Sequence, residues 1–209
     1  MTAVGGTSLG ISSTNTRAIE TGWGTSTYNS DPTTLVSTRT GWLYGAGGGV
    51  SKIFAEPSYQ TNAGLKFSGR GVPDVAALAD PQTGLLIGQT QTFPNGTYYD
   101  EYRVGGTSLA CPIFAGLMAL ADQAAGHAHG FANPLFYANP GAFYDVVSVK
   151  TAVERRNFVN SVDDSDGTAD RLRTFDDYSG SPTQHTDPGW DNVTGLGTPS
   201  DKFLSTFGK

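Results

Sequence analysis

The feature that most constrains the fold is an apolar segment that begins directly after a pair of glycines. Residues 109–125 are apolar at almost every position, so a helix formed there has no polar face. Such helices are typical of protein interiors. Pro112 falls in the first turn, where proline is tolerated, and Gly126 suits the C-cap. The segment therefore predicts a central helix that is buried on all sides.

Composition sets the class of protein. The 209 residues are 37% hydrophobic, which is enough for one domain with a core of its own. The net charge of -6 argues against nucleic acid or an anionic membrane as a partner. A single cysteine excludes an internal disulfide and a cysteine-based zinc site. No apolar run approaches the length of a membrane span, and the first residues do not resemble a signal peptide.

Turn residues divide the rest of the chain into elements. Apolar runs at 73–79 and 84–90 predict two buried strands, with a turn at 80–84 between them. The turn at 93–96 predicts a hairpin whose second strand covers 97–104. Short helices are expected at 131–138 and at 199–207, the latter capped by Thr198. Residues 10–48 are rich in Thr, Ser and Gly and predict a surface loop with one hairpin.

Ser108 is the candidate nucleophile. It follows a strand and the tight turn at Gly105 and Gly106, and it stands where the apolar helix starts. A helix N-terminus offers free N–H groups and a positive dipole end, which stabilise negative charge developing near the serine oxygen. From the residues alone a second interpretation stays open: Ser108 only caps the helix, a role that serine favours.

Several blocks of sequence together resemble the sedolisin family of serine-carboxyl peptidases. The Gly-Thr-Ser-x-Ala-x-Pro motif at 106–112 is similar to the nucleophile motif of subtilisin-like peptidases. The further blocks that resemble the sedolisins, in order, are residues 4–9, 20–23, 47–54, 57–60, 70–75, 143–146 and 189–197. The resemblance implies that residues 1–209 are a partial peptidase domain. It also implies an α/β architecture: the C-terminal half of a subtilisin-like fold, with a parallel sheet and a buried helix after the nucleophile.

The resemblance implies a reaction and shows what this chain lacks. Sedolisins hydrolyse peptide bonds at acidic pH with a Ser nucleophile, a Glu base, an Asp that supports the Glu, and an Asp at the oxyanion. In the family the last three precede the block that matches residues 4–9. Ser108 is therefore the implied nucleophile, the partners are a peptide substrate and the missing N-terminal half, and the full-length form is expected to be secreted. The alternative is an inactive calcium-stabilised remnant or binding module.

No histidine is expected to act as a substitute base, and the cysteine is not expected to act as a nucleophile, although a catalytic thiol is conceivable from the residues alone. His127 and His129 lie beyond the far end of the predicted helix, about 28 Å from Ser108 at a rise of 1.5 Å per residue. Nothing in the sequence recommends His185 as a base. Cys111 is expected to be a small buried side chain on the helix.

The resemblance also implies one calcium ion. Its ligands would be the Asp145 and Asp191 side chains and the carbonyls of Val146, Asp187 and Gly189, all hard oxygen donors that suit calcium. Asp187 stands where the family has glycine. The alternative for the two ligating aspartates is an ordinary turn-forming role.

The motif Val-Gly-Gly-Thr-Ser-Leu occurs twice, at 4–9 and at 104–109. Only the second copy is followed by the apolar helix, whereas Ser8 is followed by a polar stretch that predicts exposed loop. We therefore expect Ser108 to be the nucleophile and Ser8 to have a structural role.

Overall fold

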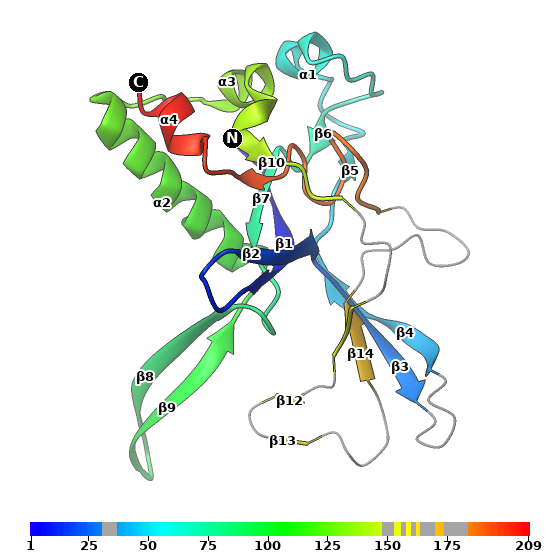
Figure 1. Ribbon diagram of the computed structural model, residues 1–209, viewed down its shortest axis with the longest axis vertical. Coiled ribbons are helices and arrows are strands. Elements are labelled where there is room, and N and C mark those ends of the chain that lie inside the picture. Colours follow the sequence, from blue (N-terminus) through cyan, green and yellow to red (C-terminus); the bar gives the residue numbers. More distant parts are fainter. Residues whose placement is uncertain (31–36, 148–152, 156–157, 160–161, 164–169, 174–183) are drawn as a thin grey trace.

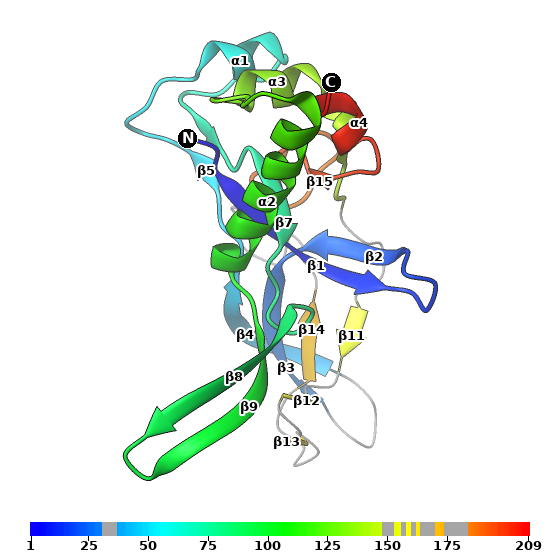
Figure 2. The ribbon, with the colours of Figure 1, turned by 90° about the vertical axis from the view of Figure 1, so that its left-hand side faces the viewer.

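The fold is seen in a computed structural model of the whole chain. The structure describes residues 1–30, 37–147, 153–155, 158–159, 162–163, 170–173 and 184–209. Figures 1 and 2 show a core of short strands and helices from which two hairpins project.

A three-stranded sheet forms the centre. Strand β1 (Val4–Ile11) lies between β2 (Arg17–Gly22), which is antiparallel to it, and β7 (Val75–Leu78), which is parallel. The glycines of β1 permit close packing, since a Cβ on Gly6 would lie 2.5 Å from the Ala79 Cβ. Among the described strands, parallel pairing occurs only between β1 and β7. The other pairings there are antiparallel, so the predicted parallel sheet is only partly seen.

The sequence predicted both projecting hairpins, but not how much of residues 10–48 is strand, nor that the second hairpin is exposed. Strands β3 (Gly24–Ser30) and β4 (Ser37–Gly45) form one hairpin, and with β2 they occupy much of the region predicted as loop. Strands β8 (Leu85–Phe93) and β9 (Gly96–Val104) form the other around the predicted turn. The β8–β9 hairpin is exposed over almost its whole length, because it extends away from the core (Figure 2), so β8 is not a buried strand.

Shorter strands complete the sheets. In the larger of these sheets, β3 also pairs with β14 (Asp170–Arg173), which pairs with β11 (Val153–Arg155). The two-stranded pairs are β5 (Gly49–Val50) with β6 (Gly71–Val72), β10 (Phe143–Tyr144) with β15 (Thr198–Pro199), and β12 (Phe158–Val159) with β13 (Val162–Asp163).

Two of the helices lie where the sequence predicts them, the last one starts later than expected, and the first one was not predicted. They are α1 (Ser58–Asn62), α2 (Thr107–Ala125), α3 (Asn133–Ala138), the 3-10 turn η1 (Pro140–Ala142) and α4 (Phe203–Phe207). Gly126 ends α2 in the left-handed conformation with φ 74°, as predicted. Thr198 does not cap α4: it lies in β15, and α4 begins after Lys202.

Helix α2 packs through one face only, which corrects the prediction of a helix buried on all sides. Its buried residues are Ala110, Phe114 and Ala121, whereas Leu120 is 49% exposed and Cys111 is also exposed. Its neighbours include β1, β7 and α4, and also α3 through Phe136, and Figure 1 shows its opposite face without a neighbouring element. Apolar side chains of α2 therefore lie also on the part of the helix surface that no described residue covers.

Among the described residues, α2 is long and apolar enough to cross a membrane by length and composition alone, contrary to the expectation from the sequence. Length and composition alone do not identify a membrane-spanning helix, because core helices of soluble proteins meet the same criteria.

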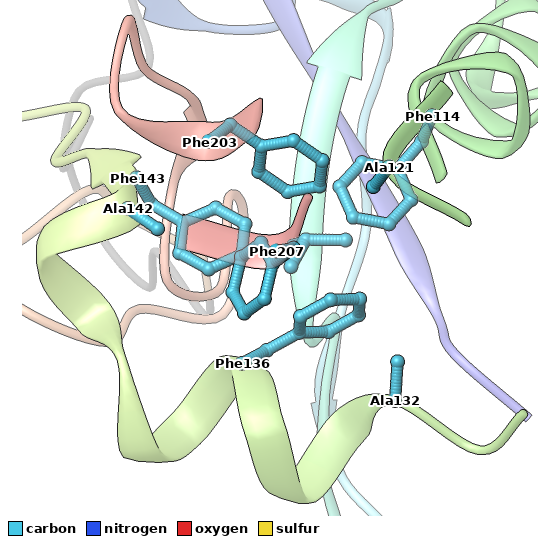
Figure 3. Packing of buried hydrophobic residues seen from close by; sticks show 9 residues of the cluster. Phe114, Ala121, Ala132, Phe136, Ala142, Phe143, Phe203 and Phe207 are labelled. Carbon is cyan, nitrogen blue, oxygen red and sulfur yellow. The ribbon is translucent and has the colours of Figure 1, made fainter. Parts of the chain in front are cut away.

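The main core consists of aromatic side chains from distant parts of the chain (Figure 3). Phe136 of α3 lies with its ring centroid 5.5 Å from that of Phe114 and 5.6 Å from that of Phe143, in edge-to-face geometry. Phe203 and Phe207 of α4 join the same cluster. A second cluster, which contains Trp23 and several alanines, joins Ala110 of α2 to Ala77 in β7 and to Ala79 directly after it. This second cluster fixes the first turn of α2 against the sheet.

Candidate active site

The chain passes from β9 into α2 through Gly105 and Gly106. Gly106 has φ 93° and ψ 160°, a backbone conformation that favours glycine. Its N–H donates to the Ala79 carbonyl at 2.5 Å, and its own carbonyl accepts from the Leu109 N–H at 2.9 Å. The junction that carries Ser108 is therefore tied both to the helix and to the residues after β7.

Gly105 has no room for a side chain. A Cβ there would lie 2.4 Å from the Pro81 nitrogen and 2.5 Å from the Ala79 carbonyl oxygen, both of them backbone atoms. Gly84 is similar, since a Cβ on it would lie 1.9 Å from the Val104 carbonyl oxygen. Backbone atoms cannot move aside as a flexible side chain can. Both positions therefore require glycine, because backbone atoms occupy the space of a Cβ.

Replacing Gly105 with Ala is expected to lower the free energy of unfolding by about 2 kcal/mol or more, because backbone must shift. Gly116 is the matched control: it lies in α2, and a Cβ on it would meet nothing within 4 Å. Gly116→Ala is expected to stabilise the chain by up to about 1 kcal/mol through helix propensity. Thermal unfolding of both variants measures this, and equal effects would contradict the close packing at Gly105.

Ser108 is exposed in the first turn of α2. The residue that caps the helix is Gly106, and no side chain forms a cap hydrogen bond. The second interpretation left open by the sequence, a capping serine, is therefore excluded. The exposure of Ser108 also corrects the prediction of a helix that is buried on all sides, since Ala110 in the same turn is completely buried and Ser108 is not.

Ser8, in the other copy of the motif, has a different environment. It is buried inside β1, and its hydroxyl donates to Asp80 Oδ2 at 2.7 Å. The strand continues to Ile11, so the exposed loop expected after Ser8 starts later than predicted. One sequence motif therefore forms a strand interior in one place and a strand-to-helix junction in the other.

In the described part of the chain the Ser108 hydroxyl has no hydrogen-bond partner, so no general base is bonded to it there. His129 pairs with Asp122 at 2.5 Å and lies beside His127, beyond the C-terminal end of α2. His185 pairs with Asp187 at 2.8 Å. These histidines are engaged elsewhere and offer no base to the serine.

Two buried carboxylates have structural partners. Glu20 accepts from the hydroxyls of Thr7 and Thr198 and pairs with Arg17 at 2.7 Å, which joins β1, β2 and β15. Asp74 accepts from the Ala3 N–H at 2.7 Å and from Arg70 at 2.6 Å. Burial raises the pKa of both carboxyls.

The residues implied as calcium ligands come together only in part. Asp145 follows β10, and its Oδ2 accepts from the Gly189 N–H at 2.8 Å, which joins the two sequence blocks. Gly189 has φ 86°, a left-handed conformation that suits glycine. The Asp187 carboxylate pairs with His185 at 2.8 Å, outside the implied ligand set, which uses the carbonyl of this residue. Val146 is completely buried directly after Asp145.

Asp191 closes its own turn. Its Oδ1 accepts from the N–H groups of Val193 and Thr194, at 2.8 and 2.7 Å, and its Oδ2 accepts from the Thr194 hydroxyl at 2.8 Å. This is the turn-forming role that the sequence left open as an alternative. In the described part of the chain no three Asp, Glu, His or Cys side chains form a metal-binding group, so an ion here would depend on backbone carbonyls.

Burial raises the pKa of Asp191 to about 6, although the hydrogen bonds from Thr194 and Val193 act in the opposite direction. Because the folded-state pKa lies above the unfolded value of about 3.9, the stabilisation is fully present below about pH 4 and is lost as pH rises through 6. In a chelator, the free energy of unfolding is therefore expected to be higher at pH 5 than at pH 7, by about 1 kcal/mol.

Melting temperatures at the two pH values test this prediction, with an expected rise of about 2–4 °C on acidification. Asp191→Asn should reduce the rise, because the amide does not titrate. A chain that becomes less stable between pH 7 and pH 5 in chelator would contradict it.

One buried residue near the Gly105–Gly106 turn was not recognised from the sequence. Asp80 appeared only as part of a turn, yet it is completely buried and accepts the Ser8 hydroxyl next to the residues that hold Gly106. The only signal was a carboxylate placed between an apolar strand and a proline.

The chain is similar to known proteins both in sequence and in structure. No family model matches the chain. Kumamolisin from Bacillus sp. (strain MN-32) is 36% identical over 164 residues, which are 73% of this chain and 23% of kumamolisin. Tripeptidyl-peptidase SED1 from Arthroderma otae is 31% identical over 185 residues, 77% of this chain and 22% of that protein. Human tripeptidyl-peptidase 1 is 30% identical over 183 residues, which are 75% of this chain and 26% of that protein.

A solved structure matches the whole fold. The serine-carboxyl proteinase sedolisin from Pseudomonas superposes with a TM-score of 0.64 at 26% identity, over 100% of this chain and 45% of sedolisin. Its fold accounts for the mixed helix and strand content described above. The chain thus spans about a quarter of the curated relatives' length and under half of the matching structure. On these matches, the chain belongs to the sedolisin family and corresponds to the C-terminal part of its peptidase domain.

Proposed function

We propose that the chain is the nucleophile-bearing part of a serine-type peptidase and that Ser108 attacks the peptide carbonyl. The observation that carries this proposal is the exposed Ser108 on a close-packed glycine turn at the start of α2, in a chain of the sedolisin family. A reactive side chain requires both access to the substrate and a rigid support. Ser108 has both, whereas the buried Ser8 has no access.

In the proposed reaction, a bond forms between Ser108 Oγ and the carbonyl carbon, and the C–N bond of the peptide then breaks. A carboxylate base takes the serine proton and returns it to the leaving amine, and water hydrolyses the acyl-enzyme. The N-terminus of α2 favours the negative charge that develops at the carbonyl oxygen. A carboxylate base works best near its own pKa, so acidic pH is the expected range.

The base belongs to the N-terminal part of the peptidase domain, which we propose as the structural partner of this chain. The face of α2 that the described residues leave uncovered supports this proposal, because it exposes Pro112, Ala115 and Ala119 on the same side of the helix as Ser108. Apolar surface of this kind is commonly an interface. Export is proposed for the full-length protein on its low charge and acidic balance.

The test is to join the chain to the N-terminal part of a sedolisin domain and to assay denatured protein between about pH 3 and 7. Turnover with an acidic optimum is the expected result. A folded, joined protein without turnover would favour the alternative, a remnant without catalysis. The melting temperature of the joined protein distinguishes that outcome from misfolding.

One calcium ion is also proposed, held by Asp145, Asp191 and the carbonyls of Val146, Asp187 and Gly189. Support comes from the contact between Asp145 and Gly189 and from a donor set made only of oxygen. When bound, the ion would stabilise the loops after β10 and before β15. It would take no part in the acyl transfer.

Calcium is expected to raise the melting temperature at pH 7, because an ion that binds only the folded chain shifts the equilibrium toward it. The rise should shrink at pH 5 as Asp191, with a pKa of about 6, takes up a proton. Asp145→Ala and Asp191→Asn should each remove most of the rise, whereas the exposed Asp201→Asn should not. A melting curve that is the same in calcium and in chelator would exclude the site.

A further inference from the structure

The turn after β7, residues 80–84, is named here the Asp80 turn. Asp80 is completely buried, and its two carboxylate oxygens hold different parts of the chain. Its Oδ1 accepts from the Gln82 N–H at 2.8 Å, inside the turn. Its Oδ2 accepts from the Ser8 hydroxyl at 2.7 Å, outside it. The carboxylate therefore shapes the turn and also anchors it to β1.

The β1 side of the turn is held by backbone as well. The Thr7 carbonyl accepts from the N–H groups of Ala79 and Asp80, at 2.9 and 3.1 Å. The Leu9 N–H donates to the Thr83 hydroxyl oxygen at 3.3 Å. The first copy of the Gly-Gly-Thr-Ser motif thus forms a rigid edge against which the turn is fixed.

The opposite side of the turn supports the second copy of the motif. The Ala79 carbonyl, directly before Asp80, accepts the Gly106 N–H at 2.5 Å. Gly105 lies so close to Pro81 that a Cβ would be 2.4 Å from its nitrogen. Gly84, at the other end of the turn, approaches the Val104 carbonyl in the same way. A shift of the Asp80 turn is therefore transmitted to Gly105 and Gly106, and so to Ser108.

We propose that Asp80 is a positioning residue for Ser108 and that Ser8 holds Asp80 in place. This inference rests on the proposed nucleophilic role of Ser108. Displacement of a reacting atom by a fraction of an ångström lowers the rate of attack without changing how the substrate binds elsewhere. The two motif copies then act together: the first holds the turn on which the second presents its serine.

The first test uses the chain itself and does not require catalysis. Amide hydrogen exchange at Gly106 is measured by NMR in the unmodified chain, in Ser8→Ala and in Ser200→Ala. Ser200 is the matched control, because its hydroxyl donates to the Ala142 carbonyl at 2.9 Å, away from the Asp80 turn. Ser8→Ala is expected to speed exchange at Gly106 about tenfold more than at the core amide of Phe203. Equal protection of Gly106 in the two variants would overturn the proposal.

The second test uses the chain joined to the N-terminal part of the domain. Ser8→Ala and Asp80→Asn are each expected to lower kcat about tenfold with KM unchanged, and Ser8→Thr, which keeps the hydroxyl, should restore kcat. A rise in KM with kcat unchanged would count against positioning. If the unmodified joined protein shows no turnover that depends on Ser108, the proposed function fails, and hydrogen exchange at Gly106 still decides whether Ser8 supports the turn.

Discussion

Ser108→Ala, in the chain joined to the N-terminal part of a sedolisin domain, is expected to abolish acyl-enzyme formation and to lower kcat about 10⁴-fold or more. Removing the nucleophile leaves only the residual catalysis of oxyanion stabilisation and binding. Ser108 is exposed and makes no hydrogen bond to the described residues, so its loss should leave the fold intact. Trapping the acyl-enzyme and detecting it by mass spectrometry gives the direct measurement.

The matched control for this substitution is Ser200→Ala, which removes a hydroxyl of the same size away from the site. It is expected to retain full activity. Acylation that persists in Ser108→Ala would overturn both the assignment of the nucleophile and the match between residues 104–109 and the family motif.

The second large effect concerns the chain by itself. Without the N-terminal part it is expected to hydrolyse denatured protein no faster than its own Ser108→Ala variant does. No described Asp, Glu or His contacts the Ser108 hydroxyl, and activation of a serine requires a base within about 3 Å. The assay covers about pH 3 to 7, the range in which a carboxylate base is active.

Peptidase activity of the isolated chain would bear on the source of the general base. Turnover that disappears in Ser108→Ala would require a base among this chain's own residues. Glu20 is not available for that role, because Thr7, Thr198 and Arg17 already hold its carboxylate. Joining the N-terminal part should then add little activity, contrary to the proposed function.

Local sequence was a sound guide where neighbouring residues decide the structure. The extent of α2 follows from its apolar run, its left-handed cap from Gly126, and the β8–β9 hairpin from the turn at 93–96. The family could also be identified from its ordered blocks, which the matches to kumamolisin and sedolisin confirm. Hydrogen bonds within a few residues and backbone preferences determine these features, so they can be predicted without knowing the neighbours in space.

Burial could not be predicted in the same way. The apolar pattern of residues 109–125 says that α2 can be covered on all sides, but only elements from elsewhere in the fold can cover it. Here β1, β7, α3 and α4 cover one face, and Cys111 and Leu120 on the rest stay exposed. For the same reason, the apolar run at 84–90 predicts a buried strand, whereas β8 extends from the core and is exposed.

Which of the two serines begins a helix follows from the sequence, because an apolar helical run follows Ser108 and a polar stretch follows Ser8. The role of Ser8 depends on the tertiary structure, since its partner Asp80 lies 72 positions away along the chain. The same holds for Gly105, whose need to be glycine comes from Pro81 and Ala79. Contacts between distant residues depend on how strands and turns pack, and no local pattern in either segment encodes the other.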